Sequence, residues 1–267
     1  MREAGCTAIE EVGLTLSNAL QYTRTAIDSG LGIDDFAPRM SFFFSSHNDI
    51  LEEVAKFRAA RKVWYQLVNQ EFRPEKKKSS QLRFHTQTAG VTLTAQQPLN
   101  NAVRVAYQAL SAVLGGTQSL HTHTFDEALG LPTALSAKIA LRTQPIIADE
   151  TGNADSVDPL AGSYLIEEMP SRIISDSGSL IKEIDDRGGA LECVKSGYQQ
   201  KLIHESAWAN LQELETGELS VIGVNVHIDE DESSGVRGQK LDVGDVRARI
   251  ESWQYPTSTR VAQAGAE

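Results

Sequence analysis

The sequence has few cysteines, no long apolar run and no excess of basic residues, and each absence excludes a class of protein. Its two cysteines, Cys6 and Cys193, are far apart and form no CxxC motif, which suits a reducing compartment with both thiols unpaired. No apolar run approaches the roughly 20 residues of a membrane-spanning helix. These features predict a cytoplasmic protein with no membrane partner.

Positive charge is also scarce. A formal net charge of −11 argues against a nucleic-acid-binding protein, because such proteins usually carry a basic surface. The one basic cluster, three lysines at residues 76–78, is short, and a solvated loop is favoured there over a phosphate clamp. With 267 residues, 40% of them hydrophobic, the chain can form one large globular domain or two small ones.

Apolar periodicity predicts that helices and strands alternate along the first half of the chain. Residues with helical spacing predict helices at 8–29, 50–73, 99–116 and 131–148, with Asn48 or Asp49 as a cap of the second and Pro132 in the first turn of the last. Short apolar stretches predict strands at 40–44, 82–88 and 118–122. Such alternation indicates an α/β fold with a parallel sheet and crossover helices.

Each predicted strand runs into a polar cluster, "SSHND", "HTQT" or "HTHTFDE". In both α/β barrels and open sheets, the chemistry lies beyond the carboxyl ends of the strands. No GxGxxG or Walker A motif follows any strand, so a barrel is favoured over a nucleotide-binding open sheet. A full (β/α)8 barrel needs eight strands and about 250 residues, and the sequence therefore predicts a partial barrel, with all polar strand ends at one mouth.

The alternation of predicted helices and strands ends near residue 158. Residues 1–157 are predicted to form the partial barrel, and residues 158–228 a mainly helical extension that includes a possible further strand at 220–226. Residues 229–267 are acidic and rich in glycine and serine at their start, which indicates a linker or tail.

One interpretation of the polar strand ends is a metal site. His121 and His123 would project to the same face of a strand, and His85 lies at the matching place on the preceding strand, with Asp126 nearby. Sites of this type assist hydrolysis. Neither a second HxH motif nor HExxH occurs in the sequence, and a metal-dependent hydrolase is kept as the alternative.

The other interpretation is a polar cofactor pocket. Gln87, Gln118, Thr122 and Glu127 offer hydrogen bonds without strong nucleophilic or basic character, and no Ser/His/Asp or Cys/His constellation stands out. A site rich in amides and hydroxyls suits a large polar cofactor that carries the difficult chemistry itself.

Five blocks carry a family resemblance: "MREAGCTAIEE", "FAPRMSFFFSSHND", "LRFHTQTAGVTLTAQQPLNNAVR", "LGGTQSLHTHTFDEALGLPT" and "DSVDPLAGSYLIE". In this order, over residues 1–225, they resemble the second half of the catalytic barrel of the adenosylcobalamin-dependent acyl-CoA mutases, the methylmalonyl-CoA mutase family. The resemblance implies a (β/α)8 barrel with a cobalamin over its mouth. It also implies a radical 1,2-rearrangement of a CoA thioester, such as methylmalonyl-CoA to succinyl-CoA.

The resemblance also assigns roles to individual residues. It implies that Arg39 and Ser41 contact the CoA part of the substrate, where the planar fork of an arginine suits phosphate. His85 and Gln87 are implied to face substrate and cofactor and to orient the thioester carbonyl. The residues implied to line the cobalamin or its adenosyl group are Glu3, Gln87, Gln118, His123, Glu127 and Ala128.

The sequence departs from the family pattern in two respects. His123 stands where the family usually has asparagine, and a Tyr-His pair, the first half of the barrel and the DxHxxG cobalamin domain have no counterpart here. The resemblance therefore implies a piece of a catalytic subunit that is inactive alone. It also implies partners, namely an acyl-CoA, a cobalamin-binding domain or small subunit, and the rest of the barrel. A non-enzymatic subunit that completes a barrel in trans stays open, as does the identity of the acyl-CoA.

Overall fold

The structure is a computed structural model that describes residues 1–229, 236 and 244. All elements and contacts below belong to that part of the chain. The acidic tail predicted over 229–267 lies, beyond Asp229, almost wholly outside the described residues.

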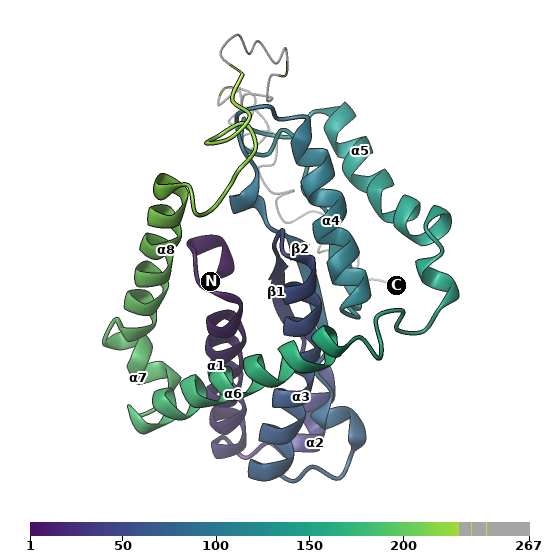
Figure 1. Ribbon diagram of the computed structural model, residues 1–267. Coiled ribbons are helices and arrows are strands. Elements are labelled where there is room, and N and C mark those ends of the chain that lie inside the picture. Colours follow the sequence, from purple (N-terminus) through teal and green to yellow (C-terminus); the bar gives the residue numbers. More distant parts are fainter. Residues whose placement is uncertain (230–235, 237–243, 245–267) are drawn as a thin grey trace, which may run out of the picture.

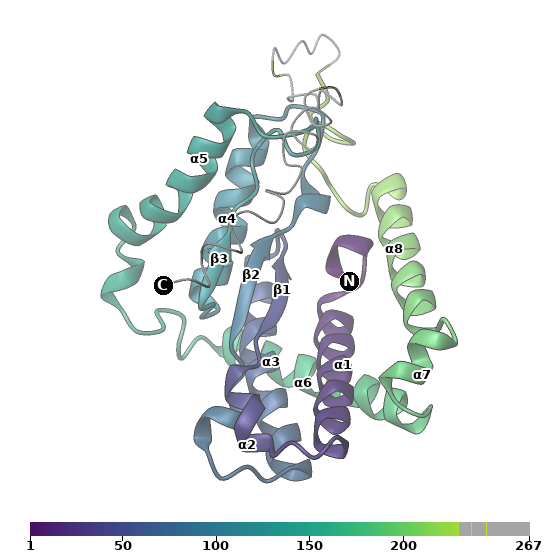
Figure 2. The same cartoon turned by 180° about the vertical axis from the view of Figure 1, so that it is seen from behind.

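Three parallel strands form one sheet in chain order, β1 (Phe42–Ser46), β2 (Phe84–Thr88) and β3 (Ser119–His121). This confirms the predicted α/β class and the parallel pairing. Figure 2 shows the three strands side by side, with helix α1 next to the free edge of β1. In the register, Ser45 lies opposite Gln87, and Gln87 lies opposite His121.

The strand predicted at 220–226 is wrong. Only an isolated bridge joins Ile222 to Val226, because the segment folds back on itself. The amide of Val224 donates to the carbonyl of Val221, the side chain of Asn225 accepts from the amide of Val221, and Gly223 adopts a positive φ of 82°. Local turn bonds therefore satisfy the backbone groups that a strand would have left for a neighbour.

The helices pack on one face of the sheet and beside its edges, and others extend away from it. Their bounds are α1 (Ala8–Asp28), α2 (Ile33–Phe36), α3 (Ile50–Glu71), α4 (Asn100–Leu114), α5 (Ala134–Pro145), α6 (Tyr164–Asp186), α7 (Ala190–Lys195) and α8 (Tyr198–Thr216).

Side chains cap several of these helices. Thr7 forms a capping box with Glu10 at α1, and Asp49 caps α3 as predicted. The expectation that Pro132 would occupy the first turn of a helix is wrong. Thr133 caps α5 through a reciprocal pair of bonds with Ser136, which satisfies amides that a proline start would leave to water.

One face of the sheet packs on α3 and builds the core. Phe42 meets Trp64 edge-on with ring centroids 4.9 Å apart. Phe57 stacks on Phe84 at 5.2 Å, and Phe44 meets Phe84 edge-on at 5.6 Å. Alternate strand residues point to this face, which explains why Phe44 and Phe84 are almost fully buried.

The opposite face of the sheet stays open in the described structure. Phe43 is 54% exposed, His85 and Gln87 are half-buried, and Ser119 and His121 are exposed. Parallel sheets are normally covered on both faces. An uncovered, polar face is therefore what the inner surface of an incomplete barrel would present.

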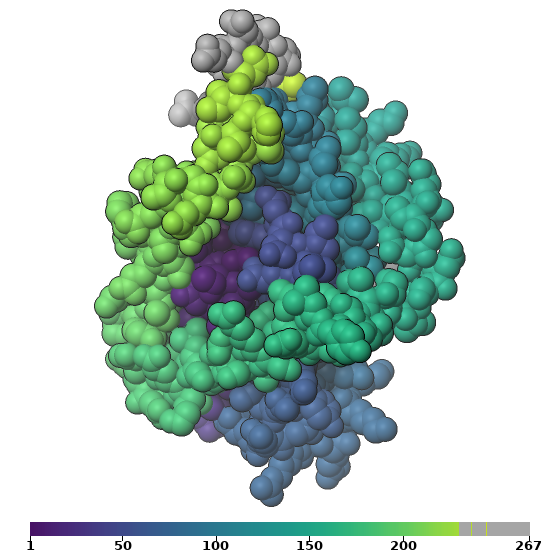
Figure 3. All heavy atoms as spheres, viewed as in Figure 1, coloured from purple at the N-terminus to yellow at the C-terminus, as the bar shows by residue number. Residues whose placement is uncertain are grey.

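The helices after residue 158 pack against the first unit. Helix α6 crosses α1 and α3, and α7 packs on α1 (Figure 1). Helix α8 returns to the amino terminus, where Gly5 faces Ala207. Figure 3 shows these N-terminal residues in a hollow bordered by α6 and α8. In the described residues, no helix is both long and apolar enough to cross a membrane.

Candidate functional site

The predicted site residues lie at two opposite edges of the sheet. Gln87 is the penultimate residue of β2, and Glu127 follows β3, so both lie at the carboxyl edge. Arg39 and Ser41 precede β1 and therefore lie at the amino edge. Arg39 and Ser41 therefore lie away from the mouth at which the polar strand ends meet, because residues before and after parallel strands sit at opposite edges.

A tight polar cluster occupies the carboxyl edge. The Nδ1 atom of His123 lies 2.9 Å from the Thr88 hydroxyl, which also accepts from the His123 backbone amide at 2.8 Å. The Nε2 atom of His123 lies 2.8 Å from the Gln87 carboxamide and 3.9 Å from a Glu127 carboxylate oxygen. Both ring nitrogens are therefore engaged, in a side chain that is only 7% exposed.

Glu3 ties the amino terminus to the same edge. Its carboxylate accepts hydrogen bonds from the Ser45 hydroxyl at 3.1 Å and from the amides of Gly90 and Val91 at 3.2 and 2.8 Å. Both oxygens are thus occupied within the protein. Ala128, next to Glu127 in the turn after β3, is exposed at the rim.

A buried ionic cluster lies beneath this edge, and the sequence analysis did not identify it. The Lys56 ammonium contacts carboxylates of Glu11 and Glu53 and donates to the Ser45 carbonyl at 2.6 Å. Glu11 accepts from the Ser45 amide at 2.8 Å, and Arg2 pairs with Glu53 at 3.1 Å. The cluster therefore forms hydrogen bonds with the Ser45 amide and carbonyl on the free edge of β1, and buried backbone groups need such partners. The only sign of this cluster in the sequence was the presence of charged residues next to apolar positions in the segment that forms α3.

His47 lies against the cations of this cluster. Burial is the largest cause lowering its pKa to about 2, and the charges of Arg2 and Lys56 add to the effect. Its Nε2 atom is buried without a hydrogen-bond partner among the described residues. The imidazole is therefore neutral at physiological pH.

The centre of the open face holds His85, and the metal interpretation gains no support there. The Nδ1 atom of His85 lies 2.8 Å from the Ser119 hydroxyl, and its ring lies 5.3 Å from that of Phe43. His121 lies edge-on to His123, whose nitrogens are already engaged. Within the described residues, no group of three His, Cys, Asp or Glu side chains could hold a metal ion.

At the amino edge, Arg39 lines an open cavity of about 600 Å³ together with the three lysines of residues 76–78. Asp34 fixes the lysine turn by accepting from the amides of Glu75 and Lys76 at 2.9 and 3.1 Å. The structure therefore places four cations around one cavity together with the carboxylates of Asp34 and Asp35, and the three lysines are exposed, as expected of a solvated turn.

Gln118 also lies at the amino edge and does not join the carboxyl-edge cluster. Its amide oxygen accepts from the Phe84 amide at 2.7 Å, and its nitrogen donates to the Gly116 carbonyl at 2.8 Å. The side chain is thus used to finish the sheet, and its predicted contact with a cofactor remains a prediction.

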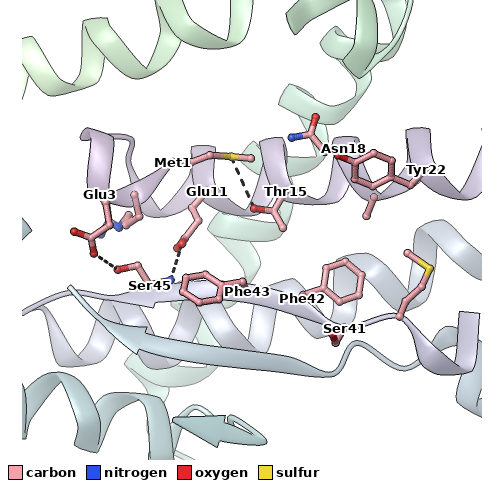
Figure 4. Close-up of a pocket in the computed structure, with 13 residues that line it drawn as sticks. Met1, Glu3, Glu11, Thr15, Asn18, Tyr22, Ser41, Phe42, Phe43 and Ser45 are labelled. Atoms are coloured by element: carbon pink, nitrogen blue, oxygen red, sulfur yellow. Dashed lines mark hydrogen bonds between the residues drawn. The ribbon is translucent and has the colours of Figure 1, made fainter. Parts of the chain in front are cut away.

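A groove along β1 connects the two edges. It encloses about 390 Å³ between α1 and the strand, with Tyr22 and Ser41 towards one end and Glu3 and Ser45 towards the other (Figure 4). The exposed ring of Phe43 lies between these ends. The groove therefore runs from Ser41 at the amino edge to Glu3 and Ser45 at the carboxyl edge, and Arg39 and Gln87 lie outside its lining.

Comparisons with known proteins give these features a context. A family model described as methylmalonyl-CoA mutase matches residues 1–264. The chain is 47% identical to methylmalonyl-CoA mutase of Rhizobium meliloti (strain 1021) over 225 residues, which are 84% of this chain and 32% of the relative. It is 42% identical to methylmalonyl-CoA mutase of Escherichia coli (strain K12) over 252 residues, covering 94% of this chain and 35% of that protein.

A third relative carries a different name. The chain is 43% identical over 230 residues to the 2-hydroxyisobutanoyl-CoA mutase large subunit of Aquincola tertiaricarbonis, which covers 86% of this chain and 41% of that subunit. This chain therefore spans about one third to two fifths of the length of these curated relatives.

Proposed function

The chain belongs to the methylmalonyl-CoA mutase family, and from that premise we propose that it forms one wall of the active site of a cobalamin-dependent acyl-CoA mutase. The proposed reaction is the 1,2-rearrangement of a CoA thioester, such as methylmalonyl-CoA to succinyl-CoA. Residues 1–157 would form part of a (β/α)8 barrel, with residues 158–228 as its helical extension. The remaining strands and a cobalamin-binding domain or subunit would come from outside the described residues.

The observation that carries the proposal is the uncovered polar face of the parallel sheet. Alternate residues of β1 and β2, Phe43, Ser45, His85 and Gln87, share this face, and all but Ser45, which is buried next to Glu3, are exposed or half-buried. Further strands joined at the free edge of β3 would extend this face towards the inside of a barrel, whereas α1 and the Lys56 cluster already bond Ser45 at the free edge of β1. An interior lined by amides, imidazoles and hydroxyls suits the binding of a polar ligand rather than a packed apolar core.

The separation of Arg39 from Gln87 supports an extended substrate. Coenzyme A carries its phosphates at one end and its thioester at the other. The cations around Arg39 at the amino edge suit the phosphates. The groove along β1 suits the linking chain, and Gln87 and His85 would meet the thioester at the carboxyl side.

The residues at the carboxyl edge also fit an adenosylcobalamin. The Glu127 side chain is 42% exposed and could accept from the two hydroxyls of a ribose, with Ala128 offering a small exposed neighbour. Glu3, whose oxygens are occupied by Ser45, Gly90 and Val91, would support the loop beneath the cofactor.

When bound, this cofactor would supply the carbon radical for the rearrangement. The residues described here would bind and orient the thioester and exclude water. We find no arrangement of the described residues that favours hydrolysis instead. Of the three histidines of the metal interpretation, His85 and His123 contact neighbouring polar side chains through their ring nitrogens, and His121 meets the His123 ring edge-on.

A graft tests the proposal. Residues 1–225 would replace the matching segment of the E. coli enzyme, and succinyl-CoA formation from methylmalonyl-CoA would be measured with adenosylcobalamin. We expect turnover by the graft and none by the isolated chain. Arg39→Ala should raise KM more than it lowers kcat, whereas Arg172→Ala, an exposed change on α6, should alter neither. A folded graft that turns over no acyl-CoA would contradict the proposal.

A further inference from the structure

The histidine that departs from the family pattern is held by three contacts whose hydrogens can be assigned. His123 Nδ1 and the His123 backbone amide both contact Thr88 Oγ1, at 2.9 and 2.8 Å. His123 Nε2 contacts the Gln87 carboxamide at 2.8 Å. Thr88 is fully buried, so its hydroxyl hydrogen needs an acceptor within the protein.

Two arrangements of a neutral imidazole fit these distances. If the Gln87 nitrogen faces His123, it donates to Nε2, and the ring hydrogen sits on Nδ1 and points at Thr88. The Thr88 oxygen then accepts from both Nδ1 and the backbone amide, and its own hydrogen has no other acceptor among the described residues. A charged imidazolium, with hydrogens on both nitrogens, leaves the same hydroxyl hydrogen without a partner.

Rotating the Gln87 carboxamide by half a turn removes this conflict. The ends of a carboxamide have nearly the same shape, so its orientation follows from the surrounding hydrogen bonds. Nε2–H then donates to the Gln87 oxygen, and the Thr88 hydroxyl donates to Nδ1 while it accepts from the backbone amide. Every contact among His123, Thr88 and Gln87 then joins one donor to one acceptor. The Glu127 carboxylate, 3.9 Å from Nε2, also favours a hydrogen on that nitrogen.

We propose that His123 is a positioning residue: as the neutral Nε2–H tautomer, it holds the Gln87 carbonyl and turns the Gln87 NH2 group towards the open face of the sheet. An asparagine at residue 123 could either donate to or accept from Gln87, and would permit both orientations. This imidazole can only donate, so it selects one. Gly90 leaves room for the ring, since a Cβ atom there would lie 3.2 Å from His123 Nε2.

The consequence for binding rests on the proposed function. Gln87 would present hydrogen-bond donors, and no acceptor, to the ligand at the carboxyl edge. It should therefore select ligands with an acceptor at that point, such as the carbonyl oxygen of a thioester. A compound of equal length without this oxygen should bind more weakly.

The tautomer can be read directly by NMR of the chain with nitrogen-15-labelled histidine, near neutral pH. A long-range proton–nitrogen correlation spectrum separates the two neutral tautomers and the imidazolium, and loss of a signal in His123→Asn assigns the residue. We expect Nε2–H in the unaltered chain and in Thr88→Ser, which keeps the hydroxyl. Thr88→Val, which removes it, should lose that pattern. An Nδ1–H tautomer or an imidazolium in the unaltered chain would overturn the proposal.

Binding supplies a separate readout. Calorimetry would compare acetyl-CoA with its thioether analogue, S-ethyl-CoA, in which the carbonyl oxygen is absent. A single hydrogen bond to the thioester oxygen should make acetyl-CoA bind about two- to tenfold more tightly than S-ethyl-CoA. Gln87→Ala should abolish this preference. Equal binding of both compounds by the unaltered protein would contradict the donor role of Gln87. Binding of neither would count against the proposed function, while the NMR spectrum alone decides the tautomer.

Discussion

Replacing Lys56 by methionine should destabilise the protein more than any surface change. The ammonium group is fully buried and serves three acceptors at once, namely Glu11, Glu53 and the Ser45 carbonyl. Methionine has a similar length but no charge, so the variant would leave the carboxylates of Glu11 and Glu53 buried without the cation that balances them.

The expected size follows from this geometry. Removing one partner of a buried ion pair costs about 3–5 kcal/mol, because the remaining charge stays desolvated. Arg2 still pairs with Glu53 at 3.1 Å, whereas Glu11 loses its cation at 2.6 Å. We therefore expect a loss of about 3–4 kcal/mol in the free energy of unfolding, a large part of the total for a domain of marginal stability.

Urea unfolding followed by circular dichroism would measure this loss. Lys182→Met is the matched control, since Lys182 pairs with Asp186 at 2.7 Å on the exposed surface of α6, and its midpoint should not change. Glu11→Gln added to Lys56→Met should recover part of the loss by removing the unpaired charge. A midpoint for Lys56→Met equal to that of Lys182→Met would refute the reasoning.

Three further predictions concern other buried features. Burial lowers the pKa of His47 to about 2 in the folded state, against 6.5 for an exposed histidine. Below pH 6.5 the unfolded chain therefore binds a proton that the folded chain does not, and the free energy of unfolding should fall by up to about 1.4 kcal/mol per pH unit. His47→Gln should flatten this slope in urea titrations at several pH values. Burial raises the pKa of the Cys6 thiol to about 12, so mass spectrometry should detect its alkylation by iodoacetamide only after unfolding. Gly5→Ala should lower stability by about 1–3 kcal/mol in thermal melts, because φ is +102° and the new Cβ would lie 2.5 Å from Ala207; Gly178→Ala, which meets nothing in its helix, should be neutral or stabilising.

Local sequence signals predicted the order of the elements because those signals act through neighbouring residues. The capping box at Thr7 and the cap at Asp49 act within one turn. The first strand was predicted two residues early, at 40–44 rather than Phe42–Ser46. The strand continues to Ser45 and Ser46, which are buried because residues distant in the sequence form hydrogen bonds with them. The Ser46 hydroxyl, for example, lies 2.7 Å from the Ser111 hydroxyl.

The site was harder to predict, because its geometry depends on which edge of the sheet each residue occupies. The residue types suggested a polar pocket, and the family resemblance supplied the assignments. Neither showed that Arg39 and Gln87 lie at opposite edges, since that follows from strand direction. The buried cluster around Lys56 was missed because Glu11 lies 45 positions from Lys56 along the chain and only the fold brings the two together, whereas Glu53 is an i,i+3 neighbour of Lys56 within α3.

The most direct test of the account is a crystal structure of the grafted enzyme with an acyl-CoA bound. The account predicts that the CoA chain runs along the groove beside β1, with its phosphates near Arg39 and the thioester oxygen within hydrogen-bond distance of the Gln87 nitrogen. A structure in which a helix covers Phe43 and His85, with the CoA on another surface, would contradict the central claim that this open face lines the active site.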